Sequence, residues 1–354
     1  MEKKRTLHLY PTMKCQLNCD YCYVNSVNVN HTELPMNEYE KLLKEAKELN
    51  VNTVDIAGGE PLLYKNTIPL LRECKKNTYI TKLVTNGLFL EKYMDNTKPD
   101  EKLIDELHVS VDSDLPEIHD RIRKHKGLHE ILCHSIKRYV EEQYGKIVIN
   151  YVLEKESASR IENILDFAYG LGVNGIDIQY IANVSFKTQK NDFSLSVEKI
   201  LDSLKQIAQW HQNNTGLNIL ISLPGYVYVI LRSKEELMKK LSGVQIIYSH
   251  GITNDNYFSD TIIVRNDGWV TGSTSMINSM EWMIGNIMDQ SIKEIWNYKK
   301  NQAIKKIKDR SKKLVSDGIC KDCIASRFCR GGDPVEFADL SDFCHIRNEL
   351  KIEI

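Results

Sequence analysis

The sequence predicts an α/β protein: an open, partial (β/α)6 barrel followed by a smaller C-terminal α+β region. Up to about residue 181, short apolar segments alternate with amphipathic helical segments, a pattern typical of βαβ units and a parallel sheet. Right-handed crossovers would curl such a sheet toward a barrel. Six strand–helix repeats are too few for the eight-stranded closed form, so we expect the barrel to stay open.

The strands are expected at 6–10, 53–58, 81–87, 106–113, 146–154 and 175–181. The spacing of apolar residues predicts helices at 36–50, 67–77, 129–143 and 159–172, the last closed by glycines. The candidate motifs follow the first four strands. In barrels of this kind the chemistry lies at the carboxyl ends of the strands, so we expect the site at that end of the sheet.

After about residue 185 the pattern changes. Residues 196–214 have the spacing of a long amphipathic helix, and 217–231 begin like a strand. Residues 261–273 predict a β-hairpin that turns at Asn266-Asp267-Gly268. A basic helix is expected within 291–313, with its lysines in solvent. We therefore predict a barrel core at 1–184, a bridging region at 185–255 and a C-terminal domain at 256–354.

The composition is that of a soluble globular protein. The chain has 354 residues, 42% of them hydrophobic and 27% charged, with a net charge of −1. This balance gives no reason to expect a nucleic acid or an acidic membrane as partner. The N-terminal residues lack the apolar run of a signal peptide, and no run of about 18 apolar residues could span a membrane. We therefore expect a cytoplasmic location.

Seven of the nine cysteines fall into two groups. Because thiols stay reduced in the cytosol, clustered cysteines there are better explained as metal ligands than as disulfides. The first group, in the stretch KCQLNCDYCY, is Cys15, Cys19 and Cys22; the second is Cys320, Cys323, Cys329 and Cys344. The other two, Cys74 and Cys133, lie in helical segments and are expected to be ordinary packed thiols.

The first group has the spacing of an incomplete iron–sulfur site. Each of the four irons of a cubane cluster needs a ligand. Three thiolates in a CxxxCxxC loop can hold three irons and leave the fourth open for a substrate or cofactor. The alternative is a zinc site with three cysteines, completed by His8 or His31.

Four further motifs follow the expected strands in order. They are AGGEPLL at 57–63, VTNG at 84–87, VSVDS at 109–113 and HDRIRKHKG at 119–127. Together with a CxxxCxxC loop that has an aromatic residue before its last cysteine, these residues resemble the radical SAM superfamily. The resemblance extends from residue 6 to about residue 181.

The resemblance implies a [4Fe–4S] cluster whose open iron chelates S-adenosylmethionine. Reductive cleavage of that cofactor would give a 5′-deoxyadenosyl radical, which abstracts a hydrogen atom from the substrate. In the family the glycine-rich motif binds the methionine amino group, and an arginine pairs with the carboxylate. Arg123 matches that arginine best, with Arg121 as a nearby competitor. The implied cofactor-binding residues are Tyr21, Gly58, Gly59, Glu60, Asn86, Ser110 and Arg123, beside the catalytic ligands Cys15, Cys19 and Cys22.

The second group supplies four thiolates, in a Cx2Cx5C pattern with a later cysteine. Such a set can close a zinc knuckle or a cubane completely. Joined to a radical SAM core, it resembles the SPASM or Twitch extension, which binds auxiliary [4Fe–4S] clusters. The segment 266–296 keeps the scaffold of that extension but has Gly272, Ser273 and Thr274 where a cysteine is expected. We therefore expect one auxiliary [4Fe–4S] cluster, for electron transfer or as a scaffold.

Relatives with such extensions mostly modify peptides. The resemblance therefore implies a ribosomal precursor peptide as substrate and an oxidative crosslink as product. The alternatives are a dehydrogenase of a small alcohol, a peptide epimerase, a formylglycine-type maturase, and a non-catalytic iron–sulfur or zinc scaffold protein. Epimerases commonly use a cysteine as hydrogen donor, and the helical positions of Cys74 and Cys133 count against that alternative.

The expected partners follow from the same resemblance. They are the precursor peptide and an electron donor such as flavodoxin or ferredoxin. Because no peptide-recognition domain is visible ahead of the barrel, the peptide would be bound either directly or through a separate leader-binding protein. Candidates for the substrate step are Asp112, Asp177 and Gln179 at strand ends, and Tyr226 and Tyr228, although capping and core packing explain such residues equally well.

Overall fold

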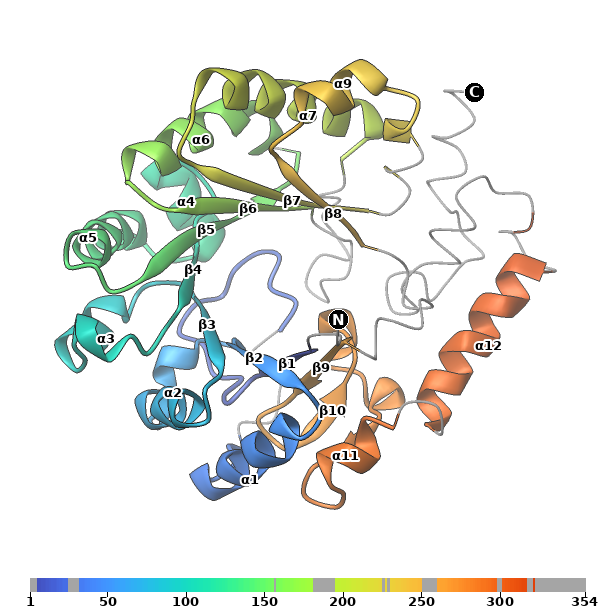
Figure 1. The fold of residues 1–354 in the computed structure, drawn as a ribbon. Helices are drawn as coiled ribbons and strands as arrows, with labels where there is room; N and C mark the ends of the chain where they lie inside the picture. The colour runs from blue at the N-terminus through green and yellow to red at the C-terminus, as the bar shows by residue number, and fades with distance from the viewer. Residues whose placement is uncertain are drawn as a thin grey trace.

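The computed structural model describes residues 5–24, 32–155, 157–180, 195–224, 227, 230–249, 260–297, 301–316 and 321 (Figure 1). These residues form one curved sheet, with helices along its outer side. The strand order is β11-β10-β9-β1-β2-β3-β4-β5-β6-β7-β8. From β1 to β8 every neighbouring pair is parallel. The predicted α/β class with a parallel sheet is confirmed.

The strands are β1 Arg5–Leu9, β2 Val51–Ile56, β3 Ile80–Thr85, β4 Glu106–Ser110, β5 Lys146–Leu153, β6 Gly175–Tyr180, β7 Asn218–Pro224, β8 Gln245–Ser249, β9 Thr261–Val264, β10 Trp269–Thr271 and β11 Gly285–Asn286. The helices are α1 Met36–Lys47, α2 Thr67–Lys76, α3 Leu90–Asp95, α4 Pro116–Arg123, α5 Leu128–Glu141, α6 Ile161–Gly170, α7 Val197–Asn213, α9 Glu235–Lys240, α11 Ile292–Ile295 and α12 Gln302–Ser316. Short 3-10 turns lie at Pro61–Leu63, Pro99–Glu101, Ser157–Arg160, Thr274–Met276 and Met280–Trp282. Among the described helices, none is long and apolar enough to cross a membrane.

The sheet is longer than the six strands that the sequence predicts. β7 and β8 continue the parallel run, and both come from the segment that was predicted to be a bridge. At the other edge, the predicted hairpin is present as β9 and β10, and β9 pairs in parallel with β1. The sheet therefore runs across both domain boundaries drawn from the sequence, and those boundaries stay predictions.

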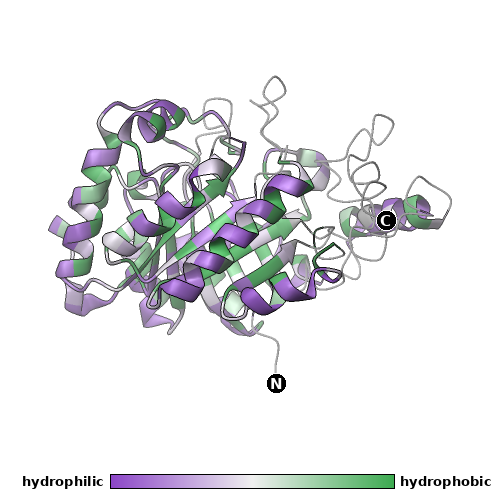
Figure 2. Cartoon of the chain, turned by 90° about the horizontal axis from the view of Figure 1, so that it is seen from above, coloured by the Kyte–Doolittle hydropathy of each residue, from purple (hydrophilic) through white to green (hydrophobic). Residues whose placement is uncertain are grey.

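The two faces of the sheet differ because successive side chains of a strand point to opposite sides. On the outer face, Leu7, Ile56 and Leu83 are fully buried in one core that they share with the helices. The helices are amphipathic: in α1, Leu42 and Leu43 are buried while polar residues of the same helix face solvent. Figure 2 shows hydrophobic colour on the strands and hydrophilic stretches along the helices around them. The main core lies between the sheet and these helices.

The inner face of the sheet, away from the helices, carries polar residues. His8, Asp55, Lys82 and Glu106 lie in register across β1 to β4. His8 Nδ1 lies 3.3 Å from Asp55 Oδ2, and the Lys82 ammonium contacts Glu106 Oε1. The ring of His108 contacts Glu106 Oε1 and Asn150 Oδ1, each at 2.7 Å. Burial opposes protonation of His108, but its contacts with Glu106 and Asn150 raise the pKa of the ring overall.

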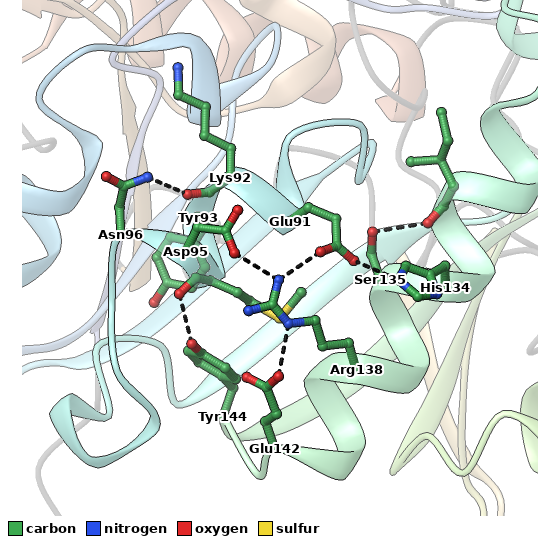
Figure 3. A network of polar contacts seen from close by, with 12 residues as sticks. Glu91, Lys92, Tyr93, Asp95, Asn96, His134, Ser135, Arg138, Glu142 and Tyr144 are labelled. Carbon is green, nitrogen blue, oxygen red and sulfur yellow. Dashed lines mark hydrogen bonds and ion pairs between the residues drawn. The ribbon is translucent and has the colours of Figure 1, made fainter.

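On the outer side, Arg138 joins two helices (Figure 3). This residue of α5 donates to Glu91 Oε2 at 2.7 Å and to Asp95 Oδ1 at 2.9 Å, both on α3. It also donates to Glu142 Oε1 at 2.8 Å, one turn further along its own helix. The pairs are partly exposed, so each adds little to the stability of the fold. They fix α3, which follows β3, against α5, which precedes β5.

The loop that carries the first cysteines begins in close contact with the glycine-rich turn after β2. Gly59 N–H donates to Thr12 O at 3.0 Å, and Glu60 N–H donates to Lys14 O at 2.8 Å. A Cβ on Gly59 would lie 2.2 Å from Lys14 O, and one on Gly58 would lie 2.4 Å from Thr12 O. Only glycine leaves room for this approach. The two glycines therefore position the cysteine loop through its backbone.

The first prediction concerns this contact. Gly59→Ala places a methyl group against two carbonyl oxygens of the backbone, Lys14 O at 2.2 Å and Met13 O at 2.5 Å. The turn and the loop must separate, so we expect a loss of about 3 kcal/mol in the free energy of unfolding. The midpoint of urea unfolding, followed by circular dichroism, measures this loss.

Gly170→Ala is the matched control. Gly170 ends α6, and a Cβ there meets nothing within 4 Å. Alanine is the better helix former by about 0.5–1 kcal/mol, so the midpoint should stay the same or rise. Equal midpoints for the two variants would contradict the close approach at Gly59.

The second prediction concerns Glu106 on the inner face. Its hydrogen bond with His108, supported by Lys82, lowers the pKa of Glu106 from 4.5 to about 2. A depressed carboxyl pKa stabilises the fold above pH 4.5, and this contribution is lost as the pH falls toward 2. Glu106→Gln should lower the free energy of unfolding by about 1.5–3 kcal/mol near pH 6. The difference should shrink toward pH 3, and it should also shrink above the raised pKa of His108, where that ring loses its charge.

Urea unfolding at about pH 3, 6 and 8.5 measures this difference. Glu236→Gln is the control, because Glu236 forms an ion pair with Lys240 at 3.1 Å but its side chain is 85% exposed. We expect less than about 0.5 kcal/mol from it at any pH. A difference between Glu106→Gln and the wild type that does not change with pH would mean that its charge contributes nothing.

Candidate functional site

Four of the motifs from the sequence meet at the carboxyl end of the sheet. The cysteine loop follows β1, the glycine-rich turn follows β2, and Asn86 follows β3 directly. Ser110 is the last residue of β4, and Arg123 is the last residue of α4. The predicted placement of the first four motifs at strand ends is therefore found in the structure, whereas Arg123 ends a helix.

The three cysteines of the first group share a small apolar cluster. Cys19 is buried, whereas Cys15 and Cys22 are partly exposed, and none of them forms a disulfide. They pack with Leu17 and Leu128. Burial raises the pKa of the Cys15 thiol to about 11, and the charges of Glu60, Cys19 and Cys22 contribute to that rise. The thiols are therefore near neighbours, and binding a metal would have to displace their protons.

The zinc site that the sequence left as an alternative would need ligands that converge on one point. Among the described residues, no three histidine, cysteine, aspartate or glutamate side chains converge on one point that could hold an ion. A cubane takes its ligands at separate corners instead. His8 is engaged with Asp55 on the inner face of the sheet, and His31 lies outside the described residues. Two N–H groups around the loop point at cysteine sulfurs, which agrees with the expected iron–sulfur cluster.

Asn86 supplies the first of these donors. Its Nδ2 lies 3.7 Å from Cys15 Sγ. Its Oδ1 accepts from Gln16 Nε2 and from Leu88 N–H, both at 3.1 Å, so the orientation of the amide is set. Sequence reasoning had included Asn86 but not Gln16. No motif marked Gln16, because its partner is 70 positions away in the chain.

Glu60 is completely buried, and its carboxylate points into the protein. Oε1 accepts from Thr85 Oγ1 at 2.8 Å and from Leu62 N–H at 3.0 Å, while Oε2 accepts from Asn86 N–H at 2.8 Å. Burial raises the pKa of Glu60 to about 6 in spite of these bonds. Glu60 therefore links the turn after β2 to the turn after β3. Its expected contact with the amino group of methionine stays a prediction.

Arg123 supplies the second donor to a sulfur. Its Nη1 lies 3.8 Å from Cys19 Sγ. The rest of the guanidinium faces Asp112, with Nε bonded to Oδ2 and Nη2 bonded to Oδ1 at 2.9 Å. Nη2 also lies 3.3 Å from Tyr21 Oη, and the Tyr21 hydroxyl donates to Asp112 Oδ1. Arg121, the competing arginine, is exposed. The structure therefore favours Arg123 as the arginine of the site.

The segment around α4 holds this arginine in place. His119 is fully buried, and its Nδ1 accepts from Asp112 N–H at 3.1 Å. Burial lowers the pKa of His119 to about 4, so the ring is neutral. The Asp120 carboxylate accepts from Gly127 N–H and from His129 N–H, which closes the turn between α4 and α5. Sequence reasoning missed His119 and Asp120, although both stand in the motif that contains Arg123.

The remaining candidates fall into two sets. Asp177 and Gln179 lie on β6 and bond each other at 3.0 Å. Asp177 Oδ1 has no partner among the described residues, and burial raises the pKa of this carboxyl. Cys74 is buried in α2, and Cys133 of α5 lies 3.7 Å from His129 Nδ1. Outside the described residues lie Tyr226, Tyr228, Cys320, Cys323, Cys329 and Cys344.

Sequence models of two domain families match the chain. The radical SAM superfamily matches residues 9–168, and the SPASM domain, an iron–sulfur cluster-binding domain, matches residues 257–324. The second match includes Cys320 and Cys323 and ends before Cys329 and Cys344. The two domains imply a [4Fe–4S] cluster that binds S-adenosylmethionine and auxiliary iron–sulfur binding, as the sequence had predicted.

Curated relatives match the radical SAM part of the chain. A probable GTP 3′,8-cyclase of Methanococcus aeolicus is 31% identical over 174 residues, which cover 48% of this chain and 57% of the relative. A protein of Methanopyrus kandleri with the same name is 26% identical over 177 residues, covering 50% of this chain and 56% of the relative. The chain thus spans little more than half the length of these relatives.

Solved structures share the fold over nearly the whole chain. Streptococcus suis SuiB has a TM-score of 0.74 at 19% identity, covering 94% of this chain and 73% of SuiB. SuiB bound to its precursor peptide SuiA has a TM-score of 0.73 at 18% identity, covering 95% and 73%. The anSMEcpe structure with bound AdoMet has a TM-score of 0.67 at 18% identity, covering 94% and 86%. The chain therefore carries a radical SAM domain at residues 9–168 and a SPASM iron–sulfur cluster-binding domain at residues 257–324.

Proposed function

We propose that this radical SAM enzyme cleaves S-adenosylmethionine reductively and abstracts a hydrogen atom from a ribosomal precursor peptide, installing an oxidative crosslink. The proposed cleavage of S-adenosylmethionine rests on the cysteine loop at the carboxyl end of the sheet. Three free thiols lie there as neighbours, with Asn86 and Arg123 donating to two of the sulfurs. Three thiolates hold three irons of a cubane and leave one coordination site for the cofactor.

The residues of the chain have separate tasks in this proposal. Cys15, Cys19 and Cys22 would hold the cluster, which when bound supplies the electron that cleaves the sulfonium of S-adenosylmethionine. The Gly58–Gly59 turn keeps the loop against the sheet. The buried Glu60 carboxylate holds Asn86 in place, and Asn86 donates to Cys15 Sγ.

The peptide substrate is supported by the fold alone. The similarity to SuiB extends over 94% of this chain, and SuiB was solved with a precursor peptide. The anSMEcpe structures contain Cp18Cys and Kp18Cys peptides. A net oxidation also suits a chain with a SPASM domain, because a second cluster can accept the electron that remains after hydrogen abstraction. We propose flavodoxin or ferredoxin as the electron donor, and a separate leader-binding protein where the peptide is not bound directly.

A second candidate is a radical reaction on a nucleotide. The curated relatives named probable GTP 3′,8-cyclase are more similar in sequence than the solved peptide-modifying structures. Their match, however, covers 48% of this chain, whereas the similarity to SuiB includes the C-terminal part. The peptide is therefore the stronger proposal, and GTP is the substrate to test beside it.

The third prediction concerns metal content. Anaerobic reconstitution should give about eight iron atoms per chain, because two cubanes contain four each. The triple variant C15A/C19A/C22A should lose about four of them and all cleavage of S-adenosylmethionine to 5′-deoxyadenosine. Cys133→Ala is the control, since this thiol lies on α5, outside the cysteine loop. Iron analysis and chromatography measure both quantities. About four irons with one zinc in the wild type would contradict the auxiliary cluster.

The fourth prediction concerns the product. Co-expression with a small peptide encoded beside this gene should convert that peptide to a species that has lost two hydrogen atoms. Mass spectrometry detects the change, and fragmentation locates the new bond. The triple cysteine variant should leave the peptide unmodified. An unchanged mass with inverted stereochemistry would indicate an epimerase instead, and conversion of GTP in the same assay would indicate the nucleotide reaction.

A further inference from the structure

The ion pair between Asp112 and Arg123 is the most completely enclosed charged contact near the cysteine loop. Asp112 is 2% exposed and Arg123 is 9% exposed. A buried ion pair is a weak stabilising device, because removing two charges from water costs about as much as their attraction returns. Stability therefore does not explain why these residues are charged. Their position beside Cys19 suggests another role.

The donors of the guanidinium are almost all engaged. An arginine has five N–H groups in a fixed plane. Nε and Nη2 hold the two carboxylate oxygens of Asp112, and Nη2 also reaches Tyr21 Oη at 3.3 Å. Nη1 is directed at Cys19 Sγ, 3.8 Å away. Only one N–H, on Nη1, has no partner among the described residues. Arg123 could bind a second carboxylate through two N–H groups only if its bonds to Asp112 were broken.

Asp112 is itself held from three directions. Arg123 binds both carboxylate oxygens, and the Tyr21 hydroxyl donates to Oδ1. Its backbone N–H donates to the buried His119 at 3.1 Å. Burial raises the pKa of Asp112, but the charge and hydrogen bonds of Arg123, together with His119 and the Tyr21 hydroxyl, lower it overall, so the carboxylate is ionised. The plane of the guanidinium is therefore determined by groups that cannot easily turn.

The charge and the donor act on a cluster bound at Cys19 in the same direction. Reduction adds one negative charge to an iron–sulfur cluster, and hydrogen bonds to the sulfurs and nearby positive charge favour that state. Nη1 brings a hydrogen-bond donor and a positive charge to Cys19 Sγ. The Asp112 carboxylate, which compensates that charge, lies on the far side of the guanidinium. Residues that bond to a metal ligand from outside the coordination sphere orient that ligand and tune the reduction potential of the metal.

We propose that Asp112 and Tyr21 are positioning residues that aim Arg123 Nη1 at the Cys19 sulfur, and that this contact makes the cluster of the cysteine loop easier to reduce. The inference rests on the proposed assignment of Cys15, Cys19 and Cys22 as cluster ligands. It gives Asp112 a role behind the cluster in place of the substrate role expected from its strand-end position. It also gives Arg123 a task that does not involve the cofactor's carboxylate.

The fifth prediction tests the potential. The midpoint of the one-electron reduction is measured by titration with dithionite, which loses the electron that the cluster gains, with detection by electron paramagnetic resonance. The cluster of the loop is the one whose signal changes on addition of S-adenosylmethionine. In D112N/R123M both charges are removed, so the net charge is unchanged. We expect its equilibrium constant for reduction to fall about tenfold, which is about 59 mV for one electron.

Two single variants accompany the double variant. Tyr21→Phe removes only the hydroxyl that bonds Asp112 and Arg123, so it should lower the midpoint in the same direction by a smaller amount. Arg121→Lys is the matched control, because Arg121 belongs to the same helix but is exposed. It should leave the midpoint unchanged. Because Tyr21→Phe changes no charge, it still tests the proposal if the double variant fails to fold.

The contact itself can be observed in the wild-type enzyme. When all arginines carry 15N, electron–nuclear double resonance of the reduced cluster should show a 15N coupling. The coupling should be absent from Arg123→Lys and present in Arg121→Lys. No coupling in the wild type, or equal midpoints for the wild type and D112N/R123M, would overturn the proposal. So would an Arg123→Lys variant that binds S-adenosylmethionine far more weakly while its midpoint without that ligand is unchanged.

Failure of this inference is distinguishable from failure of the proposed function. If C15A/C19A/C22A keeps the signal that responds to S-adenosylmethionine, the cluster is held elsewhere and the proposed function fails. If the triple variant loses that signal while D112N/R123M and Tyr21→Phe keep the wild-type midpoint, only the role of Arg123 and its two supporting residues is wrong.

Discussion

The structure depends most on the close contact between the backbone at residues 12–14 and the glycine-rich turn after β2. Two backbone hydrogen bonds continue the pairing of β1 with β2 beyond the ends of both strands. Glu60 belongs to that turn, and its buried carboxylate accepts a hydrogen bond from the backbone N–H of Asn86 after β3. Asn86 in turn reaches Cys15 Sγ. A residue with a Cβ at Gly59 would break the first contact of this series, while Thr85 Oγ1 and Leu62 N–H would still bond Glu60.

The opposite side of the cysteine loop is held by a different kind of interaction. There the contacts come from side chains, through Asp112 after β4 and Arg123 at the end of α4. The loop is thus fixed by backbone contacts on one side and by a buried ion pair on the other. Backbone contacts determine where the loop lies, and the ion pair determines the charge around it. The two properties can therefore change independently in evolution or by mutation.

Much of the fold, and less of the site, could be predicted from the sequence. The alternation of strands and helices predicted β1 to β6, and Asn266-Asp267-Gly268 predicted the hairpin of β9 and β10. β8 was missed because five residues with mixed polarity give no clear period. The site motifs were placed correctly because strand ends in a parallel sheet share one edge. The sequence already favoured Arg123 over Arg121, but the pairing of Asp112 with Arg123 and the inward turn of Glu60 required the structure. Each depends on which way a side chain points, which residue type and spacing do not determine.

The position of β9 beside β1 has a consequence for biosynthesis. Asn278 Nδ2 donates to Tyr23 O at 2.9 Å, although these residues are 255 positions apart, and Tyr10 N–H donates to Val264 O. The start and the end of the cysteine loop thus acquire these partners only when residues 264 and 278 have been made. At about 5–20 residues per second, this takes on the order of ten to fifty seconds. During that time the thiols at the N-terminus have left the ribosome without their final surroundings. Until then the three thiols lack two of the contacts that hold their loop in the finished fold.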